Sequence, residues 1–101
     1  MRHLFIINPT AGKAGDRRAL EEHIRTQVPG AAVVYTQGPG HGRDLARQAA
    51  EGGSPVRLYA CGGDGTLNEV VNGAAGYDSA AVTNVPLGTG NDFLRIFGPG
   101  W

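Results

Sequence analysis

The segment best equipped for chemistry is residues 61–69, CGGDGTLNE, in which three glycines surround one carboxylate. Gly62, Gly63 and Gly65 carry no Cβ atoms, so the phosphate groups of a ligand could come close to the backbone there. A carboxylate beside a phosphate is repelled by roughly 4 kcal/mol per pair of unit charges at 4 Å, for an effective dielectric constant of 20. We therefore expect Asp64 to address Mg²⁺, an acceptor hydroxyl or a basic neighbour. The alternative is that Asp64 braces the loop by accepting backbone hydrogen bonds.

The residues on either side of this segment predict a strand, a glycine loop and a helix. The apolar run 56–60 precedes the segment, and the amphipathic run 67–74 leaves it. Thr66 and Glu69 have the spacing of a capping box, in which each side chain accepts a hydrogen bond from the backbone amide of the other residue. The helix dipole and the remaining free N–H groups would favour an anion. The alternative is that these glycines form a tight turn between strand and helix and bind no ligand.

Two further segments rich in small polar residues also follow apolar runs. They are residues 8–12 (NPTAG) and residues 86–93 (PLGTGNDF). The carboxyl ends of parallel strands meet at one edge of a sheet, where ligands bind, so we expect these loops to converge with the glycine loop. Besides backbone amides, the expected donors to a phosphate-bearing ligand are the side chains of Thr66, Asn68, Thr89 and Asn91.

Short apolar runs alternate with amphipathic stretches along the chain, which is the pattern of an α/β protein. The predicted strands cover residues 2–7, 31–35, 56–60 and 80–86. The predicted helices cover residues 17–28, about ten residues around 45–50, residues 67–74 and residues 92–97. Asp16 is the expected N-cap of the first helix, and either Asn72-Gly73 or Gly76 is expected to end the third. The economical fold is a three-layer α/β/α domain whose mainly parallel sheet has about four strands.

The composition excludes several classes of protein. A chain of 101 residues has the size of one domain, and its formal net charge of zero indicates no nucleic-acid partner. The sequence contains neither a run of about 18 apolar residues nor a signal-peptide pattern. Cys61 is the single cysteine, which suits a reducing cytoplasm, and we interpret it as a small buried residue rather than a reactive thiol. The three histidines share no ligand spacing with it, so no structural zinc site is expected.

Two common phosphate-binding motifs are excluded. Gly12-Lys13 suggests a Walker A loop, but Ile7 and Ala14 stand where that motif requires glycine and serine or threonine. Lys13 is therefore interpreted as an exposed loop residue, with a phosphate contact as the alternative. The dinucleotide fingerprint G-x-G-x-x-G fails as well, because Asn68 stands at its last position.

Taken together, the motifs resemble those of the diacylglycerol kinase catalytic domain family, which includes bacterial lipid kinases and sphingosine kinases. The resemblance runs over essentially the whole chain. The matching segments are Asn8-Pro9-x-x-Gly12, residues 62–69, residues 86–93, and Thr36 with Gly40-His41. The glycine–aspartate core alone is shared with NAD kinases and phosphofructokinases, but its combination with the other segments is much more specific.

The resemblance implies the N-terminal nucleotide-binding part of a lipid kinase that uses ATP and Mg²⁺ to phosphorylate a diacylglycerol-like hydroxyl. In that family a second, β-rich domain supplies the lipid pocket, further Mg²⁺ ligands and the general base, and nothing in this sequence matches it. We therefore expect residues 1–101 to be the first part of a longer cytoplasmic protein and to be inactive alone. Peripheral membrane contact of the full-length protein and a homo-oligomer are left open.

The site expected from the motifs and the resemblance can be stated residue by residue. The predicted nucleotide-binding residues are Asn8, Pro9, Thr10, Ala11, Gly12, Thr36, Gly62, Gly63, Asp64, Gly65, Thr66, Leu67, Asn68 and Thr89. Asp64 is also the predicted catalytic residue, and no metal ligand is assigned. Two alternatives stay open, namely a kinase of a soluble substrate similar to NAD kinase and a free-standing nucleotide-binding module.

Overall fold

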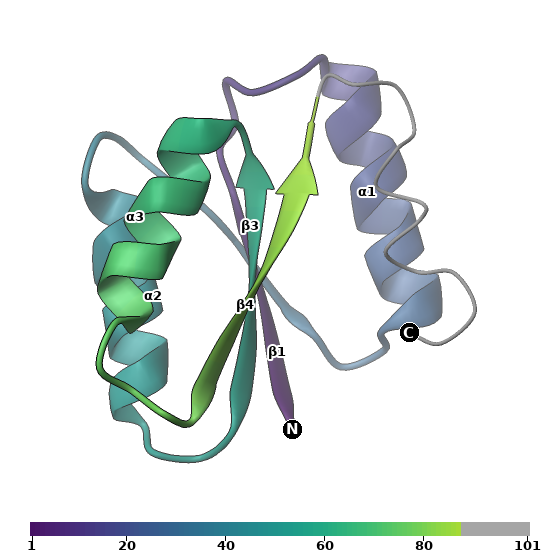
Figure 1. The fold of residues 1–101 in the computed structure, drawn as a ribbon. Coiled ribbons are helices and arrows are strands. Elements are labelled where there is room, and N and C mark those ends of the chain that lie inside the picture. Colours follow the sequence, from purple (N-terminus) through teal and green to yellow (C-terminus); the bar gives the residue numbers. More distant parts are fainter. Residues whose placement is uncertain (88–101) are drawn as a thin grey trace.

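The computed structural model describes residues 1–87, in which strands and helices alternate along the chain (Figure 1). In chain order the elements are β1 (Arg2–Ile7), α1 (Ala14–Gln27), β2 (Ala32–Tyr35), α2 (His41–Glu51), β3 (Val56–Gly62), α3 (Asp64–Ala74) and β4 (Ala80–Pro86). The strands form one sheet in the order β2-β1-β3-β4, and every pairing is parallel. The predicted α/β fold is therefore confirmed for the described residues. The helix predicted over residues 92–97 lies outside them.

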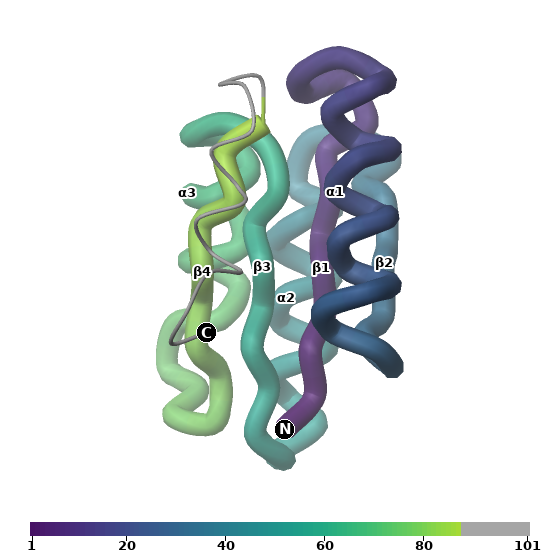
Figure 2. The backbone as a smooth tube through the Cα atoms, turned by 90° about the vertical axis from the view of Figure 1, so that its right-hand side faces the viewer, coloured from purple at the N-terminus to yellow at the C-terminus, as the bar shows by residue number. Residues whose placement is uncertain are grey.

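Helices cover both faces of the sheet. α1 lies on one face, and α2 and α3 lie together on the other (Figure 1 and Figure 2). Phe5 of β1 and Tyr59 of β3 belong to the core on the α1 side, where their rings stack with centroids 3.9 Å apart. Ile6 and Leu58, the neighbours of these residues in sequence, belong to the core under α2 and α3. All four side chains are fully buried, which explains why the central strands have nearly continuous apolar sequences.

The two helices on the shared face approach each other most closely at Gly73 of α3. A Cβ atom on Gly73 would lie 2.2 Å from the carbonyl oxygen of Arg43 and 2.9 Å from the Cβ atom of Ala46, both in α2. Only glycine fits at this position without separating the helices. α3 continues past Gly73 and ends at Ala74, and Gly76 follows with a φ of +87°. Of the two predicted ends of this helix, Gly76 is therefore the one observed.

The strand boundaries agree closely with the sequence pattern, but the start of α1 does not. β1 and β4 have the predicted bounds, and β2 begins at Ala32 rather than at residue 31. α1 begins at Ala14, so Asp16 is its third residue and not its N-cap. The Asp16 carboxylate accepts a hydrogen bond from the amide of Lys13, which is the N-cap (3.1 Å). Asp16 thus still serves the helix start, but from inside the first turn.

The predicted glycine loop is much shorter than expected. β3 extends to Gly62 and α3 begins at Asp64 rather than at Leu67, so only Gly63 separates them. The strand continues to Gly62 because this residue still pairs with Pro86 of β4. Gly63 is the N-cap of α3 in an extended conformation and leads the chain directly into the helix.

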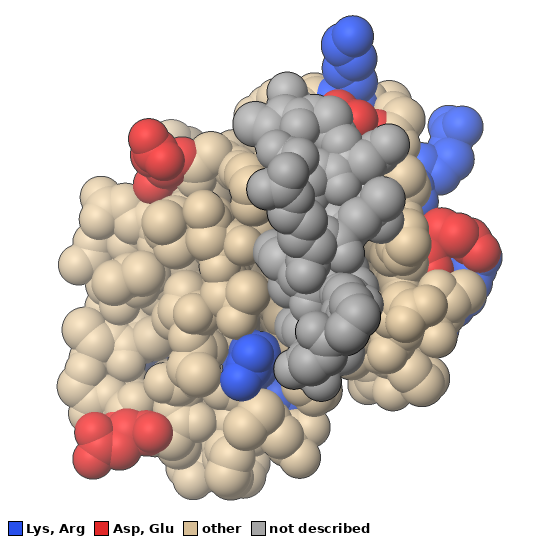
Figure 3. All heavy atoms as spheres, turned by 45° about the vertical axis from the view of Figure 1, so that its right-hand side comes forward, with Lys and Arg blue, Asp and Glu red and all other residues tan. Residues whose placement is uncertain are grey.

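Charged side chains of both signs are scattered over the face shown in Figure 3. On α2, Arg47 lies 3.5 Å from Asp44 and 3.7 Å from Glu51, so opposite charges neighbour each other along that helix.

None of the helices in the described part of the chain has the length and apolar character needed to cross a bilayer.

Candidate functional site

Backbone hydrogen bonds hold the loops at the carboxyl ends of the strands side by side. The Thr36 amide donates to the Ile7 carbonyl oxygen (2.9 Å), and the Asn8 amide donates to the Cys61 carbonyl oxygen (2.9 Å). These bonds continue the sheet pairing past the ends of β1 and β2, so each loop begins beside its neighbour. The predicted convergence at one edge of the sheet is therefore confirmed for residues 8–12 and the glycine segment, and the loop after β2 joins them. The third predicted segment, residues 86–93, lies mostly outside the described residues.

A pocket of about 390 Å³ opens at this edge. Of the predicted nucleotide-binding residues, those that line it are Asn8, Pro9, Thr10, Thr36, Gly65 and Thr66. Those that belong to the same loops, to the end of β3 or to α3 but do not line it are Ala11, Gly12, Gly62, Gly63, Asp64, Leu67 and Asn68. Thr89 and the motif around it lie outside the described residues.

Four lining residues are absent from the sequence-based prediction, namely Gln37, Gly38, Pro39 and Glu69. The first three follow Thr36 in the loop after β2, and the rule that ligands bind beside strand ends would have found them. Glu69 carries a different signal. Thr66, Glu69 and Gly73 are spaced i, i+3 and i+7, so they share one face of the helix. Because Gly73 of that face packs on α2, the spacing places Glu69 at the junction of the two helices.

The first turn of α3 offers backbone N–H groups beside the pocket. Its N-cap, Gly63, has no side chain to accept from them, and the first helical bond runs from the Leu67 amide to the Gly63 carbonyl oxygen (3.1 Å). The amides of Asp64, Gly65 and Thr66 precede that bond, and a helix leaves such groups for another partner. The helix dipole adds partial positive charge at the same point. This end of α3 is therefore suited to an anion such as phosphate.

The predicted capping box between Thr66 and Glu69 is wrong. Thr66 is the third residue of α3 and only 7% exposed, whereas an N-cap stands before the first turn. The Glu69 carboxylate does not reach back along its own helix. It accepts hydrogen bonds from the amides of Gly40 (3.1 Å) and Gly42 (2.9 Å) at the start of α2. The neighbouring helix has free amides within reach of the carboxylate, and these take the place of the Thr66 amide.

The glycines of the segment have different roles. A Cβ atom on Gly62 would lie 2.5 Å from Oγ1 of Thr66 and 3.3 Å from Cβ of Asn8, so the packing of the protein itself requires Gly62. Cβ atoms on Gly63 and Gly65 would meet no atom of the described part of the chain within 4 Å. Space for a ligand beside the backbone is therefore found at Gly63 and Gly65, whereas the space beside Gly62 is taken by Thr66.

Side chains of the protein set the shape of the loop after β1. Oδ1 of Asn8 accepts from the Thr10 amide (2.9 Å) and from the Thr10 hydroxyl (2.8 Å), which makes an Asx turn. Arg17 of α1 donates to the Ala11 carbonyl oxygen (3.0 Å). Gly12 has a φ of +64°, the left-handed region that favours glycine. Asn8 and Thr10 thus line the pocket from a loop that is shaped without a ligand.

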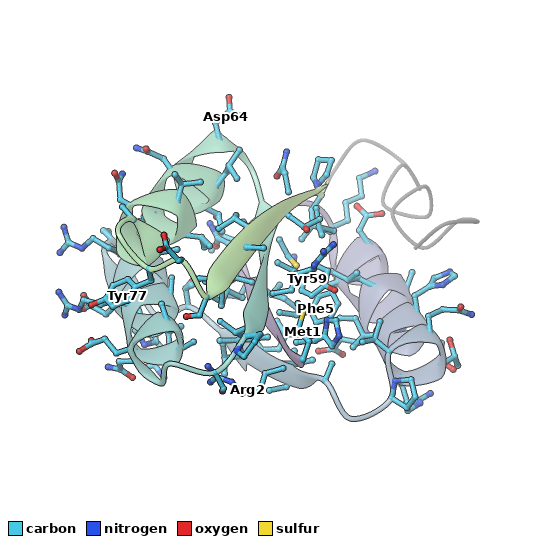
Figure 4. All side chains as sticks on the ribbon, turned by 60° about the horizontal axis from the view of Figure 1, so that its bottom comes forward. Met1, Arg2, Phe5, Tyr59, Asp64 and Tyr77 are labelled. Carbon is cyan, nitrogen blue, oxygen red and sulfur yellow. The ribbon has the colours of Figure 1, made fainter. Side chains whose placement is uncertain are left out.

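Asp64 is the first residue of α3, and its side chain projects outward in Figure 4. The residue is exposed, and no hydrogen bond or ion pair engages its carboxylate within residues 1–87. The described structure therefore gives no support to a role for Asp64 as a brace of the loop. The same residues nowhere gather three His, Cys, Asp or Glu side chains that could hold a metal ion. The Asp64 carboxylate is free to meet a cation or a hydroxyl that comes with a ligand.

Cys61 and Lys13 lie where the sequence predicts. Cys61 is fully buried at the end of β3, and its thiol donates to the Tyr59 carbonyl oxygen (3.6 Å). Burial raises the pKa of the Cys61 thiol far above its ordinary value, so the reactive thiolate is suppressed. Lys13 is exposed in the loop before α1.

Comparisons with known proteins agree with one another. The family model for the diacylglycerol kinase catalytic domain matches residues 2–100. YtlR of Bacillus subtilis (strain 168) is 41% identical over 99 residues, covering 92% of this chain and 32% of YtlR. Diacylglycerol kinase of the same strain is 34% identical over 102 residues, covering 96% of this chain and 33% of the enzyme. The crystal structure of a diacylglycerol kinase from Bacillus anthracis str. Sterne matches with a TM-score of 0.72 at 26% identity, covering 93% of this chain and 33% of the solved one. The chain thus spans about a third of the length of these proteins.

Proposed function

The chain belongs to the diacylglycerol kinase catalytic domain family, and from that premise we propose that it is the nucleotide-binding part of an ATP-dependent lipid kinase. One observation carries the proposal. The loops after β1 and β2 and the first turns of α3 line a pocket at the carboxyl edge of the sheet, and α3 begins there without a side-chain cap. Phosphoryl transfer depends mainly on positioning and on electrostatic stabilisation, and a site of this kind supplies both.

ATP fits the residues at this edge. A volume of about 390 Å³ lies in the range of small-molecule sites, roughly 300–1,000 Å³. The amides of Asp64, Gly65 and Thr66 would hold phosphate oxygens, and the open space at Gly63 and Gly65 lets phosphate reach the backbone. The side chains that we propose to hold the rest of the nucleotide are Asn8, Thr10 and Thr36, with Thr89 beside them.

Mg²⁺ fits the same end of the pocket as a companion of the phosphates. Proteins commonly bind this ion through one or two carboxylates together with phosphate oxygens of the substrate. Asp64 supplies one exposed carboxylate next to the amides that would hold the phosphates. When bound, the ion would neutralise charge on the transferred group. Asp64 would hold the ion or orient the acceptor hydroxyl, and either role makes it the catalytic residue of this part.

The acceptor that we propose is a lipid hydroxyl similar to that of diacylglycerol. The support is the family together with the printed name of the diacylglycerol kinase relative. Because the chain spans about a third of that relative, we propose that residues beyond 1–101 form the lipid pocket and supply the general base. The 101-residue chain would then bind MgATP weakly and transfer nothing to lipid. The complete kinase would work in the cytoplasm and meet its substrate at the membrane surface.

Titration of the chain with MgATP, followed by calorimetry and by amide chemical shifts, tests the nucleotide site. We expect shifts in the loops after β1 and β2 and at the start of α3, with MgCl₂ alone as the control. Shifts confined to the opposite edge of the sheet, around Arg2 and Val56, would place the ligand elsewhere and overturn the proposed site. Release of ADP that depends on diacylglycerol, catalysed by residues 1–101 alone, would overturn the proposed division of labour.

A further inference from the structure

Glu69 joins the two helices on the shared face of the sheet. Its Oε2 atom accepts from the Gly40 amide (3.1 Å) and its Oε1 atom accepts from the Gly42 amide (2.9 Å). Gly40 is the N-cap of α2 and has no side chain of its own to cap the helix. A carboxylate of α3 therefore caps α2, and both of its oxygens are used.

Gly42 makes room for this contact. A Cβ atom on Gly42 would lie 2.8 Å from Oε1 of Glu69 and 3.4 Å from its Cβ atom. Gly42 is buried in the first turn of α2, a part of a helix where glycine is otherwise unfavourable. The glycine and the carboxylate thus fit each other, although they come from different helices.

The same carboxylate helps to form the pocket. Glu69 lines the pocket together with Gln37, Gly38 and Pro39, the residues that lead into α2. His41 holds the turn formed by residues 37–39. Its Nδ1 atom accepts from the Gln37 amide (2.9 Å), and its amide donates to the Gly38 carbonyl oxygen (3.2 Å). Because Glu69 fixes the amides on either side of His41, it sets the position of this wall relative to α3.

Charge gives the pocket two unlike ends. The negative charge of Glu69 stands beside the wall formed by Gln37, Gly38 and Pro39, whereas the free amides of α3 begin at Asp64. The Glu69 charge repels phosphates from the first end. At the second end the free amides and the helix dipole attract them, and the Asp64 carboxylate there is compensated when Mg²⁺ accompanies the phosphates. The nucleoside half of a nucleotide would therefore lie against the wall, where the carboxylate has already satisfied the amides of α2.

We propose that Glu69 is a positioning residue of the nucleotide site. By capping α2 it holds the wall of residues 37–39 against which the nucleoside lies, and it leaves α3 as the helix end that receives the phosphates. This inference rests on the proposed nucleotide function. It adds to that function a residue outside the predicted site that acts through α2 and not on the reacting atoms.

The variant Glu69→Gln tests the inference, because it keeps the size of the side chain and replaces one acceptor oxygen by a donor. That NH₂ group would face a backbone amide, so one of the two hydrogen bonds is lost. We expect hydrogen exchange of the Gly40 and Gly42 amides in the 101-residue chain to become at least about tenfold faster. We expect the Kd for MgATP to rise about tenfold, equivalent to about 1.4 kcal/mol. The Kd for magnesium tripolyphosphate should change less than about twofold, because that ligand needs only the α3 end.

The matched control is Glu51→Gln at the far end of α2, where the half-exposed carboxylate meets only Arg47 among the described residues. It should alter neither the exchange rates nor either affinity. A second variant, Gly42→Ala, disturbs the contact from the α2 side by moving the carboxylate. Gly42→Ala should raise the Kd for MgATP as Glu69→Gln does. The Kd of the double variant should not exceed the higher Kd of the two single variants, because both changes disturb the same contact. If Glu69→Gln fails to fold, Gly42→Ala decides the question alone.

The outcomes separate this inference from the proposed function. A wild-type chain that does not bind MgATP overturns the nucleotide function and the positioning role with it. Normal MgATP binding by both variants overturns the role of Glu69 and leaves the function standing. Equal weakening of MgATP and tripolyphosphate shows a general loss of structure and also overturns the positioning role. Selective loss of MgATP with faster exchange at Gly40 and Gly42 supports it.

Discussion

The two helices on the shared face, α2 and α3, begin at the same edge of the sheet but are completed by different partners. Each starts after a glycine, Gly40 or Gly63, that offers no capping side chain. The protein supplies the anion for α2 itself, through the carboxylate of Glu69. The first amides of α3 receive no such side chain within residues 1–87. A glycine before a helix therefore does not mark a ligand site, and what matters is whether the protein already provides the acceptor.

The glycines near the two helix starts also fall into two groups, according to whether the protein itself occupies the space that a Cβ atom would take. Gly62 and Gly73 are required because a Cβ atom would meet a fixed part of the protein, whereas a Cβ atom on Gly42 would meet the movable end of the Glu69 side chain. At Gly63 and Gly65 no atom of residues 1–87 occupies that space, so a ligand has room there. The segment that reads as one glycine loop in the sequence thus combines a packing glycine with two open ones.

The largest effect is expected when the two helices are forced apart. Gly73→Ala would place a Cβ atom 2.2 Å from the Arg43 carbonyl oxygen, and we expect a loss of about 3 kcal/mol in unfolding free energy. Urea denaturation measures it. The control is Gly65→Ala, which has open space and sits in a helix, so stability should stay level or rise slightly. Equal stability of Gly73→Ala and wild type would mean that the helices are not in contact here.

The next effect concerns Asp64 at the start of α3, whose carboxylate is exposed, whereas the Glu69 carboxylate at the start of α2 is engaged by two amides. In the full-length kinase that we propose, Asp64→Asn should lower kcat about a hundredfold while the Kd for nucleotide changes less than about twofold. Removing a charge near phosphates relieves repulsion in the ground state, whereas the group that meets Mg²⁺ or the acceptor is lost in the transition state. Steady-state kinetics, nucleotide titration and a melting curve measure these quantities. A parallel fall of affinity, stability and kcat would leave Asp64 as scaffold.

A third experiment makes α3 resemble α2. Gly63→Asp adds an acceptor at the N-cap of α3, where the φ of −102° suits any residue and the space is open. We expect a gain of a few tenths of a kcal/mol in stability and a Kd for MgATP about tenfold higher, because the new carboxylate competes with phosphate for the same amides. Gly63→Ala, which adds no acceptor, should retain most of the affinity. Unchanged MgATP binding by Gly63→Asp would show that these amides do not hold the phosphates.

The smallest effect tests the corrected role of Thr66. Since Thr66 is not an N-cap, Thr66→Ala should change the unfolding free energy by less than about 0.5 kcal/mol, with better helix propensity offsetting lost packing. The affinity for MgATP should fall a few fold because a hydroxyl that lines the pocket is removed. Thermal melting and calorimetry measure the two quantities. A loss of 1 kcal/mol or more, about the value of a helix cap, would argue for the capping box after all.

The sequence alone predicted the sheet and most of its boundaries, because period and turn residues are local signals. β1 and β4 end where the apolar runs end, and Cys61 is buried as its position indicates. The helix starts were missed for one shared reason. Asp16 and Thr66 are residue types suited to an N-cap, but each occupies the third position of its helix. Asp16 serves there by accepting from the N-cap amide, so residue type does not distinguish the two positions.

The partner of Glu69 was out of reach of local reasoning. Its hydrogen bonds join α3 to Gly40 and Gly42 at the start of α2, and these glycines precede Glu69 by 29 and 27 residues in the sequence. Capping rules examine only neighbours in sequence, so they assign the carboxylate to Thr66. The other three unpredicted lining residues follow Thr36 in the loop after β2, and there the strand-end rule was within reach but was applied only to Thr36.

Because Cys61 is buried, the rate at which its thiol reacts with a reagent measures how often this part of the sheet opens. Cys61 is the single cysteine of the chain and lies near the end of the central strand β3. The next residue, Gly62, packs against Thr66, which lines the pocket. A thiol reagent can reach Cys61 only when that part of the sheet opens, so the rate of labelling counts openings directly. A molecule that binds the loops after β1 and β2 and the start of α3 only while they are closed would slow that rate as its occupancy rises. One side chain with no part in the chemistry thereby reports, through its reaction with a thiol reagent, on ligands that hold this edge of the sheet closed.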